Sequence, residues 1–494
     1  MTRLSISGHS SPWGADFMKR VIVAVVCGAL LVAGTPATAQ STAAYDRQRI
    51  DWKPCAPTGL ECATFRAPLN WTRPWEPETA TIAISRKRAT ERAKGVTLTN
   101  PGGPGSPGRH YPAELASALP DQDLIGMDPR GTGGSTPKIG CGGLPTLPLD
   151  LDLRDRSREN VRRIYQRTEQ LAKACQANRQ IDVVNTEQTV RDMDLLRSLL
   201  GQQKLNFFGV SAGGWLGSHY TAYFPHRVGR FVLDSGTDFT GSLEDWLRDQ
   251  QRSVERRFRE DYLDWVSKSD AKATLGTNVE QVRATYEQVR AGLAANPIQV
   301  APGRALTPTV WDLGFYWSLH KEKDFGARTQ IFRAVHELQH GTGDRTPVED
   351  WVNAFYDNPL PDTMNATFLG TICNDSPSLY PDLNREAIEQ GRRYPLMGWY
   401  QLSGVCAYWQ RPPLHLRPVT GNGLPPILLL GSMRDPANSH EGVLRNHQRL
   451  RGSRLITVAG SGDHGVFANG TDCVDKAVRE FLSTGRPPAA DLTC

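Results

Sequence analysis

Short apolar runs rich in β-branched residues recur along the chain, and most of them end at glycine, proline or aspartate. Such runs predict strands buried on both faces, because a strand covered on both sides needs apolar side chains at consecutive positions. Segments with helical spacing of apolar residues lie between them, and strands that alternate with helices are typical of a mostly parallel sheet. The clearest predicted strands are residues 81–85, 96–99, 124–127, 205–208, 230–233, 427–430 and 455–458.

The strand pattern is interrupted in the second half of the chain, where a segment rich in tryptophan and tyrosine shows helical periodicity instead. Its clearest helical stretches are residues 243–267, 278–293 and 326–340. Most of its aromatic residues should form the core of this segment, and some should line a pocket where it meets the sheet. We therefore expect an α/β core from residues 40–238 and 425–494, with a large, mainly helical cap inserted at residues 239–424.

Composition and charge change this picture little. Hydrophobic residues make up 39% of the 494 positions and charged residues 22%, which is ordinary for a globular protein with a packed core. The net charge is +5, and the arginine-rich stretch at 248–259 is interleaved with Asp249 and Glu255, as on a solvated helix face. We expect no nucleic-acid partner.

The N-terminal residues have the pattern of a signal peptide. Lys19 and Arg20 precede an apolar run at residues 21–34, and Ala37-Thr38-Ala39 follows as a small-residue cleavage pattern. A retained membrane anchor is the alternative, but the run is shorter than the about 20 residues that cross a bilayer. We therefore expect residues 1–39 to be removed, the mature protein to be secreted or periplasmic, and no stable membrane association afterwards.

The cysteines support export. Of nine cysteines, one lies in the predicted signal peptide, and an even number in an exported chain implies disulfides. Short separations favour the pairs Cys55 with Cys62, Cys141 with Cys175, Cys373 with Cys406, and Cys473 with Cys494. Because no CxxC motif occurs, nothing indicates a zinc or thiol-redox site, and we expect neither a metal nor a cofactor.

A candidate nucleophile follows the predicted strand 205–208. Gly209-Val210-Ser211-Ala212-Gly213 is a GxSxG motif, and a helical pattern follows it directly. A sharp strand-to-helix turn requires small residues on both sides of the serine and holds its hydroxyl exposed above the sheet edge. This context predicts that Ser211 is an activated nucleophile.

A serine hydroxyl barely ionises near neutral pH, so it needs a histidine base and an acid that orients this histidine. In folds with this turn the order along the chain is serine, acid, histidine. Asp435 and His464 lie in the loops after the last two predicted strands, and we predict them as acid and base. Asp463 and Asp234 are alternative acids, but Asp463 is adjacent to the histidine and its side chain should point elsewhere.

The oxyanion of a tetrahedral intermediate needs backbone donors. The N–H of Ala212 directly follows the nucleophile and is one candidate. The glycine-rich turn after strand 96–99 supplies the other, because glycines let the backbone approach a substrate without a Cβ clash. We prefer Gly103 over Gly102. Asp128 and Arg130 follow another strand, and we expect them to brace the active-site floor rather than to react.

Taken together, these motifs resemble one known family. NPGGPGSPG at 100–108, DLIGMDPRGTGGSTP at 123–137, GVSAGGWLG at 209–217 and the segment 425–494 are similar to secreted bacterial tripeptidyl aminopeptidases and related prolyl aminopeptidase-like α/β-hydrolases. The resemblance covers most of the chain after the leader and is weakest across the cap. Members commonly carry an aromatic residue after the nucleophile, whereas this chain has Ala212.

The resemblance implies a serine peptidase that releases short peptides, often tripeptides, or single residues from free N-termini, with Ser211, Asp435 and His464 as its catalytic residues. Such an enzyme must bind the ammonium group of its peptide substrate. Glu349 and Asp350 in the cap are the first candidates for this role; Asp375, Glu244 and Asp245 are others. The same triad would also serve a carboxylesterase or amidase, and a catalytically inactive binding protein is a third hypothesis.

Overall fold

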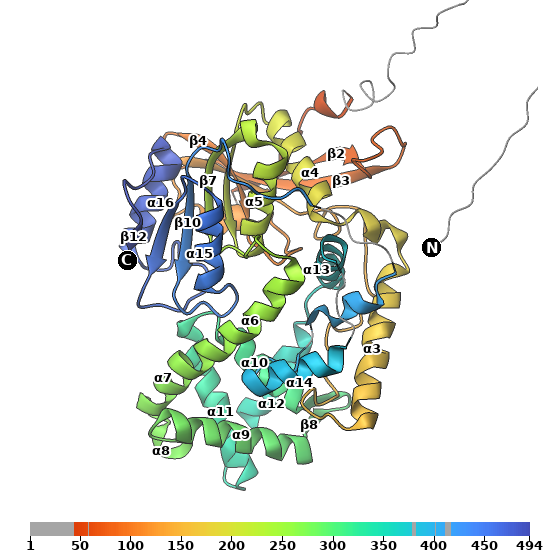
Figure 1. The fold of residues 1–494 in the computed structure, drawn as a ribbon, viewed down its shortest axis with the longest axis vertical. Coiled ribbons are helices and arrows are strands. Elements are labelled where there is room, and N and C mark those ends of the chain that lie inside the picture. Colours follow the sequence, from red (N-terminus) through yellow and green to blue (C-terminus); the bar gives the residue numbers. More distant parts are fainter. Residues whose placement is uncertain (1–43, 58, 378–381, 401, 411–415) are drawn as a thin grey trace, which may run out of the picture.

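The computed structural model describes residues 44–494 except 58, 378–381, 401 and 411–415 (Figure 1). The predicted signal peptide, residues 1–39, lies outside the described residues. Within the described ranges, no helix combines the length and the apolarity that crossing a membrane requires.

One large sheet organises the core, and its ten described strands run in the order β1-β2-β3-β5-β4-β6-β7-β10-β11-β12. The pairs β1–β2, β2–β3 and β3–β5 are antiparallel, and all other neighbours in the sheet are parallel. The strands are β1 (Lys53–Cys55), β2 (Leu60–Pro68), β3 (Thr79–Lys87), β4 (Gly95–Asn100), β5 (Gln122–Met127), β6 (Leu205–Val210), β7 (Val228–Asp234), β10 (Ile427–Ser432), β11 (Arg454–Val458) and β12 (Leu492–Thr493). The predicted α/β fold with a mostly parallel sheet is therefore confirmed.

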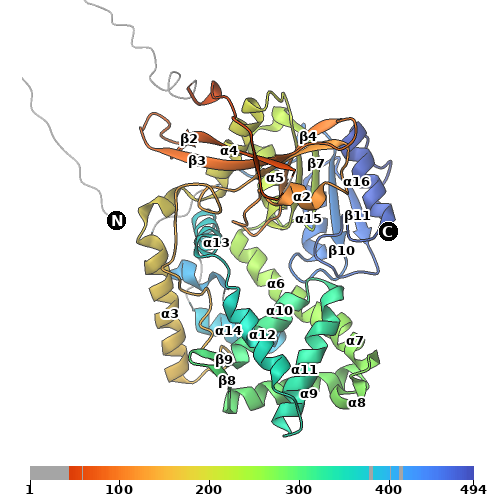
Figure 2. The ribbon, with the colours of Figure 1, turned by 180° about the vertical axis from the view of Figure 1, so that it is seen from behind.

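Helices cover both faces of this sheet because alternate residues of its central strands point to opposite sides. Phe207 of β6 belongs to the apolar cluster formed with α4 (Thr186–Leu199), α5 (Ala212–Tyr223) and α15 (His440–Arg449). Its neighbour Phe208 belongs to the cluster on the other face, with α2 (Tyr111–Leu115) and α16 (Asp472–Thr484). Figure 2 shows α2 and α16 from that second side.

The cap lies at the carboxyl edge of the sheet (Figure 1). It has an apolar core of its own, in which the ring of Phe315 packs edge to face against Phe258, Tyr286 and Trp311. The three predicted helical stretches are present. The cap elements are α6 (Leu243–Arg257), a π-helical turn (Phe258–Tyr262), α7 (Leu263–Lys268), α8 (Lys272–Leu275), α9 (Val279–Ala295), the hairpin β8 (Ile298–Ala301) and β9 (Arg304–Leu306), α10 (Pro308–Ser318), α11 (Phe325–Gln339), α12 (Thr346–Asp357), α13 (Asp362–Asp375), α14 (Leu383–Arg393) and a 3₁₀ segment (Leu402–Tyr408).

One segment that the sequence assigned to the core also contacts the cap. Leu147 and Leu153 belong to the apolar cluster of the cap, and Ile164 on α3 (Arg158–Gln176) packs against it, whereas Leu171 and Cys175 of α3 belong to a core cluster. Conversely, Leu369 of α13 belongs to a core cluster. The apolar clusters of the cap and of the core therefore each include residues from both sides of the expected boundary at residue 239.

Four disulfides join the pairs that sequence separation favoured: Cys55–Cys62, Cys141–Cys175, Cys373–Cys406 and Cys473–Cys494. The second ties the loop before α3 to α3 itself, and the third ties α13 to the 3₁₀ segment. The third bridge thus links two elements of the cap.

Candidate active site

Ser211 lies on a sharp turn between β6 and α5, at φ 59° and ψ −124°, a conformation that side-chain-bearing residues rarely adopt. The flanking glycines make this turn possible. A Cβ on Gly209 would lie 2.7 Å from the carbonyl carbon and oxygen of Gly213, and a Cβ on Gly213 would lie 2.8 Å from the Asn100 carbonyl oxygen. The GxSxG motif therefore forms the strained elbow expected of a nucleophilic serine.

Asp435 and His464 come together on the loops after β10 and β11, which are parallel neighbours and so end at the same sheet edge as β6. The His464 Nδ1 atom lies 2.9 Å from Asp435 Oδ2 and 3.1 Å from Asp435 Oδ1. The backbone N–H groups of Ala437 and Asn438 donate to Asp435 Oδ1 at 2.8 and 2.9 Å. The carboxylate is thus fixed as an acceptor that faces the histidine.

Electrostatics favour the ionised form of this acid. Burial acts to raise the pKa of Asp435, but the charge and the hydrogen bond of His464 and the two backbone donors outweigh it, and the pKa lies below its usual value. A carboxylate that stays ionised holds Nδ1 of the histidine protonated, which leaves Nε2 free to act as a base.

The alternative acids are engaged elsewhere. Both carboxylate oxygens of Asp234 accept the backbone N–H of Val466, and one also accepts that of Phe467. Asp463 accepts from the Arg257 guanidinium at 2.7 Å and from the Asn469 amide at 3.0 Å. Both residues therefore hold the histidine loop in place, and the geometry favours Asp435 as the partner of His464.

The Ser211 hydroxyl has a neighbour that sequence analysis missed. Asn438 Nδ2 donates to Ser211 Oγ at 3.3 Å, and this is the only hydrogen bond to Oγ among the described residues. Among the described residues, Ser211 Oγ makes no hydrogen bond to His464. Such bonds are often long or misaligned before substrate binds, so this does not argue against a serine–histidine pair. Asn438 lies three residues after Asp435, but only the fold brings it to a serine 227 positions earlier.

The glycine-rich turn after β4 lies against the nucleophile. A Cβ on Gly102 would lie 2.8 Å from Ser211 Cβ and 3.2 Å from the backbone nitrogen of Ala212. The Gly102 N–H already donates to Asn100 Oδ1 at 2.9 Å, whereas the Gly103 N–H has no acceptor among the described residues. Gly103 and Ala212 therefore remain the candidate oxyanion donors.

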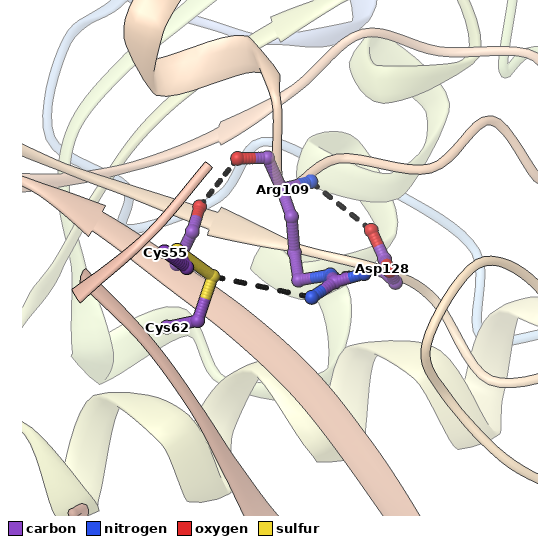
Figure 3. Close-up of a disulfide and its surroundings, with 5 residues drawn as sticks. Cys55, Cys62, Arg109 and Asp128 are labelled. Atoms are coloured by element: carbon purple, nitrogen blue, oxygen red, sulfur yellow. Dashed lines mark hydrogen bonds and ion pairs between the residues drawn. A yellow bond between two sulfur atoms is a disulfide. The ribbon is translucent and has the colours of Figure 1, made fainter. Parts of the chain in front are cut away.

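Asp128 and Arg109 brace the end of this turn (Figure 3). Asp128 accepts the backbone N–H groups of Gly108 and Arg109 at 2.9 and 3.0 Å, and the Arg109 guanidinium at 2.8 Å. The Arg109 guanidinium also approaches Cys62 Sγ, at 4.0 Å, so the turn is tied to the disulfide beside β2. This agrees with the structural role expected for Asp128.

Arg130 makes a second brace beneath the site. Its guanidinium is fully buried and binds both carboxylate oxygens of Asp192 on α4, at 2.8 and 2.6 Å. Further bonds to the carbonyls of Pro68 and Leu69 and to the side-chain oxygen of Gln188 engage its three remaining donors. Arg130 thus joins β2 to α4 and takes no part in the reactive edge.

The cap touches the loop that carries His464 directly. The backbone N–H of His464 donates to the His320 carbonyl at 2.9 Å, Lys321 Nζ donates to the Gly465 carbonyl at 2.9 Å, and the Glu322 N–H donates to Asp463 at 2.9 Å. Residues 320–322 follow α10. Desolvation, and then the charge of His464, lower the pKa of His320 to about 4, so its ring is neutral beside the base at pH 7.

The cap carboxylates considered for substrate binding differ in their surroundings. Glu349 forms an ion pair with Arg345 on the same helix, and Asp350 is exposed; neither is brought to Ser211 by a contact among the described residues. Glu244 on α6 is buried, and its Oε1 has no hydrogen-bond donor among the described residues. Burial, and then the charge of Asp245, raise the pKa of Glu244 to about 8.

The fold and the site define the class of the protein: it is an α/β-hydrolase whose strained serine shares a sheet edge with a paired histidine and aspartate. Residues 98–279 match the family model described as alpha/beta hydrolase fold, and residues 394–494 match the model described as TAP-like protein. A tripeptidyl aminopeptidase of Streptomyces lividans is 30% identical over 484 residues, which cover 91% of this chain and 87% of that protein. The chain belongs to the family of the tripeptidyl aminopeptidases, within the serine hydrolases of the α/β-hydrolase fold.

Two other relatives carry different names. Serine protease Hip1 of Mycobacterium tuberculosis is 27% identical over 489 residues, which cover 90% of this chain and 91% of that protein. Carboxylesterase B of the same species is 28% identical over 459 residues, which cover 88% of this chain and 86% of that protein. The family therefore includes proteins named for peptide bonds and for ester bonds.

Proposed function

We propose that this protein is an exported serine aminopeptidase that releases short peptides, of about tripeptide length, or single residues from free N-termini through an acyl-enzyme on Ser211. The observation that carries the proposal is the distance of 2.9 Å between His464 Nδ1 and Asp435 Oδ2 at the sheet edge where Ser211 is strained, in a chain of this family. The predicted signal peptide and the four disulfides support export.

Acylation begins when His464 Nε2 takes the proton of the Ser211 hydroxyl and Oγ attacks the carbonyl carbon of the scissile peptide bond. The N–H groups of Gly103 and Ala212 then stabilise the oxyanion. His464 is now an imidazolium, and Asp435 stabilises it because its pKa is lowered and it stays ionised. His464 gives the proton to the leaving amine, the C–N bond breaks, and the N-terminal fragment remains as an ester on Ser211.

Deacylation repeats these steps with water as the nucleophile. His464 Nε2 takes a proton from the water, the water oxygen attacks the ester carbonyl, and the same backbone donors stabilise the second oxyanion. The proton then returns to Ser211 Oγ as the ester bond breaks. The N-terminal fragment leaves as a free carboxylic acid, and the enzyme is restored.

An aminopeptidase must also bind the free ammonium group of its substrate. Glu349 and Asp350 are the residues expected from the sequence, but the ion pair of Glu349 and the exposure of Asp350 favour Glu244 instead. Desolvation raises the pKa of Glu244, and a nearby ammonium group would favour its ionised form, so this buried acid gains from such a partner. Glu244 lies on α6, whose Trp246 donates to the Ala437 carbonyl in the Asp435 loop at 3.0 Å.

The proposal is tested by digesting matched peptide libraries with free and with acetylated N-termini and determining product lengths by mass spectrometry. We expect cleavage near the N-terminus of free-amine peptides only, and none by S211A. S218A, which alters a buried serine on the adjacent helix, should retain activity. Equal cleavage of acetylated peptides would overturn the aminopeptidase proposal.

A carboxylesterase or amidase is the second candidate, and the relative named carboxylesterase B is the observation that favours it. The same nucleophile, base and oxyanion donors would hydrolyse a small ester. Turnover of short-chain p-nitrophenyl esters at a kcat/KM far above that of any free-amine peptide would favour this candidate.

A further inference from the structure

Asn438 is a buried residue outside the Ser–His–Asp set whose side chain contacts the Ser211 hydroxyl. It is 2% exposed and lies on the loop between β10 and α15. Its backbone N–H holds Asp435 at 2.9 Å, and its side-chain amide donates to Ser211 Oγ at 3.3 Å. One residue thus links the candidate acid to the candidate nucleophile.

The surroundings determine which end of the amide faces the serine. Asn438 Nδ2 also donates to the Ser235 carbonyl at 2.6 Å, and its Oδ1 accepts from the Thr237 hydroxyl at 3.3 Å. The reversed amide would place Oδ1 against the Ser235 carbonyl oxygen, where two acceptors would repel. The group next to Ser211 Oγ is therefore an N–H donor.

A donor at this position acts on the oxygen of the serine hydroxyl and not on its hydrogen. It occupies a lone pair of Oγ and leaves the Oγ hydrogen free for His464 Nε2. As that proton leaves, negative charge grows on Oγ, and a hydrogen bond to a charged acceptor is stronger than one to a neutral acceptor. The same gain recurs in deacylation, when Oγ is the leaving group.

We propose that Asn438 is a fourth catalytic residue, whose amide N–H stabilises the negative charge on Ser211 Oγ both when the serine attacks and when it leaves. The amide keeps its hydrogen throughout, and the only proton transferred is the one that moves between Oγ and His464 Nε2. This inference rests on the proposed role of Ser211 as nucleophile.

A merely structural role for Asn438 makes different predictions. Its amide also links the Asp435 loop to Ser235, so its loss could act by displacing the acid. A displaced acid would move the acidic limb of the pH–rate profile, whereas a lost donor to Oγ would lower the rate without moving that limb. Asn446 provides a matched control, because it is an equally buried asparagine whose amide donates to the carbonyls of Gly236 and Thr237 and does not touch Ser211.

The experiment compares N438A, N438D and N446A with the wild type in three measurements: labelling by a fluorophosphonate, burst kinetics with a p-nitrophenyl ester, and turnover of a free-amine tripeptide anilide. We expect N438A to lower the labelling rate, the burst rate and the steady-state rate each about 10–100-fold, as for one hydrogen bond to a charged group, with KM and the acidic limb of the pH profile unchanged. N438D replaces the donor by an acceptor and should lose more. N446A should lower thermal stability but keep kcat.

N438A rates within about threefold of the wild type, or a shifted acidic limb, would overturn the role of Asn438. If N438A does not fold, the isosteric N438D carries the test, and a rate near that of the wild type would be equally decisive. Wild-type protein that is folded but not labelled would overturn the role of Ser211 as well. Labelling with no turnover of free-amine peptides would overturn only the aminopeptidase proposal.

Discussion

The exchange of Asp435 for asparagine tests the candidate triad most directly, because the surrounding donors fix how the new amide must sit. The backbone N–H groups of Ala437 and Asn438 require an acceptor at the position of Oδ1. The amide NH₂ of an asparagine would therefore take the position of Oδ2, 2.9 Å from His464 Nδ1. Two donors cannot face each other, so the imidazole must adopt the tautomer with its hydrogen on Nε2.

The expected loss is large, because that tautomer cannot accept the proton of Ser211. In a serine protease in which the equivalent change leaves the geometry intact, the wrong tautomer lowers kcat by about 10⁴. We expect a decrease of about 10³–10⁴ in kcat for D435N, with KM changed little, since Asp435 is buried behind the histidine and does not contact substrate. The overall fold should persist.

The assay is steady-state turnover of a free-amine peptide anilide together with fluorophosphonate labelling, and the control is D463N. Asp463 is adjacent to His464 but binds Arg257 and Asn469, so the same chemical change should lower kcat less than about tenfold and act mainly on stability. A smaller loss in D435N than in D463N would refute the assignment of the acid.

Three further changes test other parts of the structure. E244Q should unfold at a higher temperature than the wild type at pH 8–9 but not at pH 4–5, as thermal unfolding across pH would measure. The pKa of Glu244 is raised to about 8 in the folded state, whereas the unfolded state loses this proton above a pKa of 4.5. The stability of the wild type therefore falls as pH rises between these two values, and glutamine removes this loss. D312A should lower the free energy of unfolding by about 3–5 kcal/mol in denaturant titrations, because it removes the buried carboxylate that binds Arg290 at 2.8 Å and Arg154 at 3.3 Å inside the cap, and Arg290 keeps only its ion pair with Asp152 among the described residues. G102A should abolish fluorophosphonate labelling, since a Cβ there would lie 2.6 Å from the Val210 carbonyl oxygen at φ 103°.

The core was predictable because its central strands are buried on both faces and therefore leave an unbroken apolar signal. The strands β1 and β12 are only three and two residues long, and β2 exposes several side chains, so they leave no such signal. The candidate residues Ser211, Asp435 and His464 could be selected from the sequence because each follows a recognisable strand. In contrast, α3 contacts the core through Leu171 and the cap through Ile164, and its own amphipathic pattern does not specify this division.

The residues that sequence analysis missed share one property: they contact the candidate nucleophile or the loop of the histidine from a distant part of the chain. Asn438 contacts Ser211 across 227 positions, and Glu322 contacts Asp463 across 141. No local pattern encodes such a pairing. Residue type alone could not rank the candidates for amine binding, since burial separates Glu244 from Glu349.

The loop of His464, the proposed base, is held by hydrogen bonds from both the core and the cap, so the cap cannot move without affecting this loop. From the core, Asp234 accepts the N–H groups of Val466 and Phe467. From the cap, the His320 carbonyl accepts the N–H of His464 itself, and Lys321 binds the next carbonyl. Because a displacement of about 1 Å in a reacting group can cost a hundredfold in rate, we expect the cap to affect catalysis through the position of His464, the proposed base.

Helices α10 and α6 of the cap also contact the loop that carries Asp435. Tyr316 on α10 donates to Gln250 at 3.3 Å, and Gln250 on α6 donates to the Ala437 carbonyl at 3.3 Å, two residues after Asp435. The helices that should select the substrate are therefore bonded to the loops of both Asp435 and His464. A substrate that shifts α10 on binding would move the base with it, so we expect changes at this contact to alter kcat rather than KM alone.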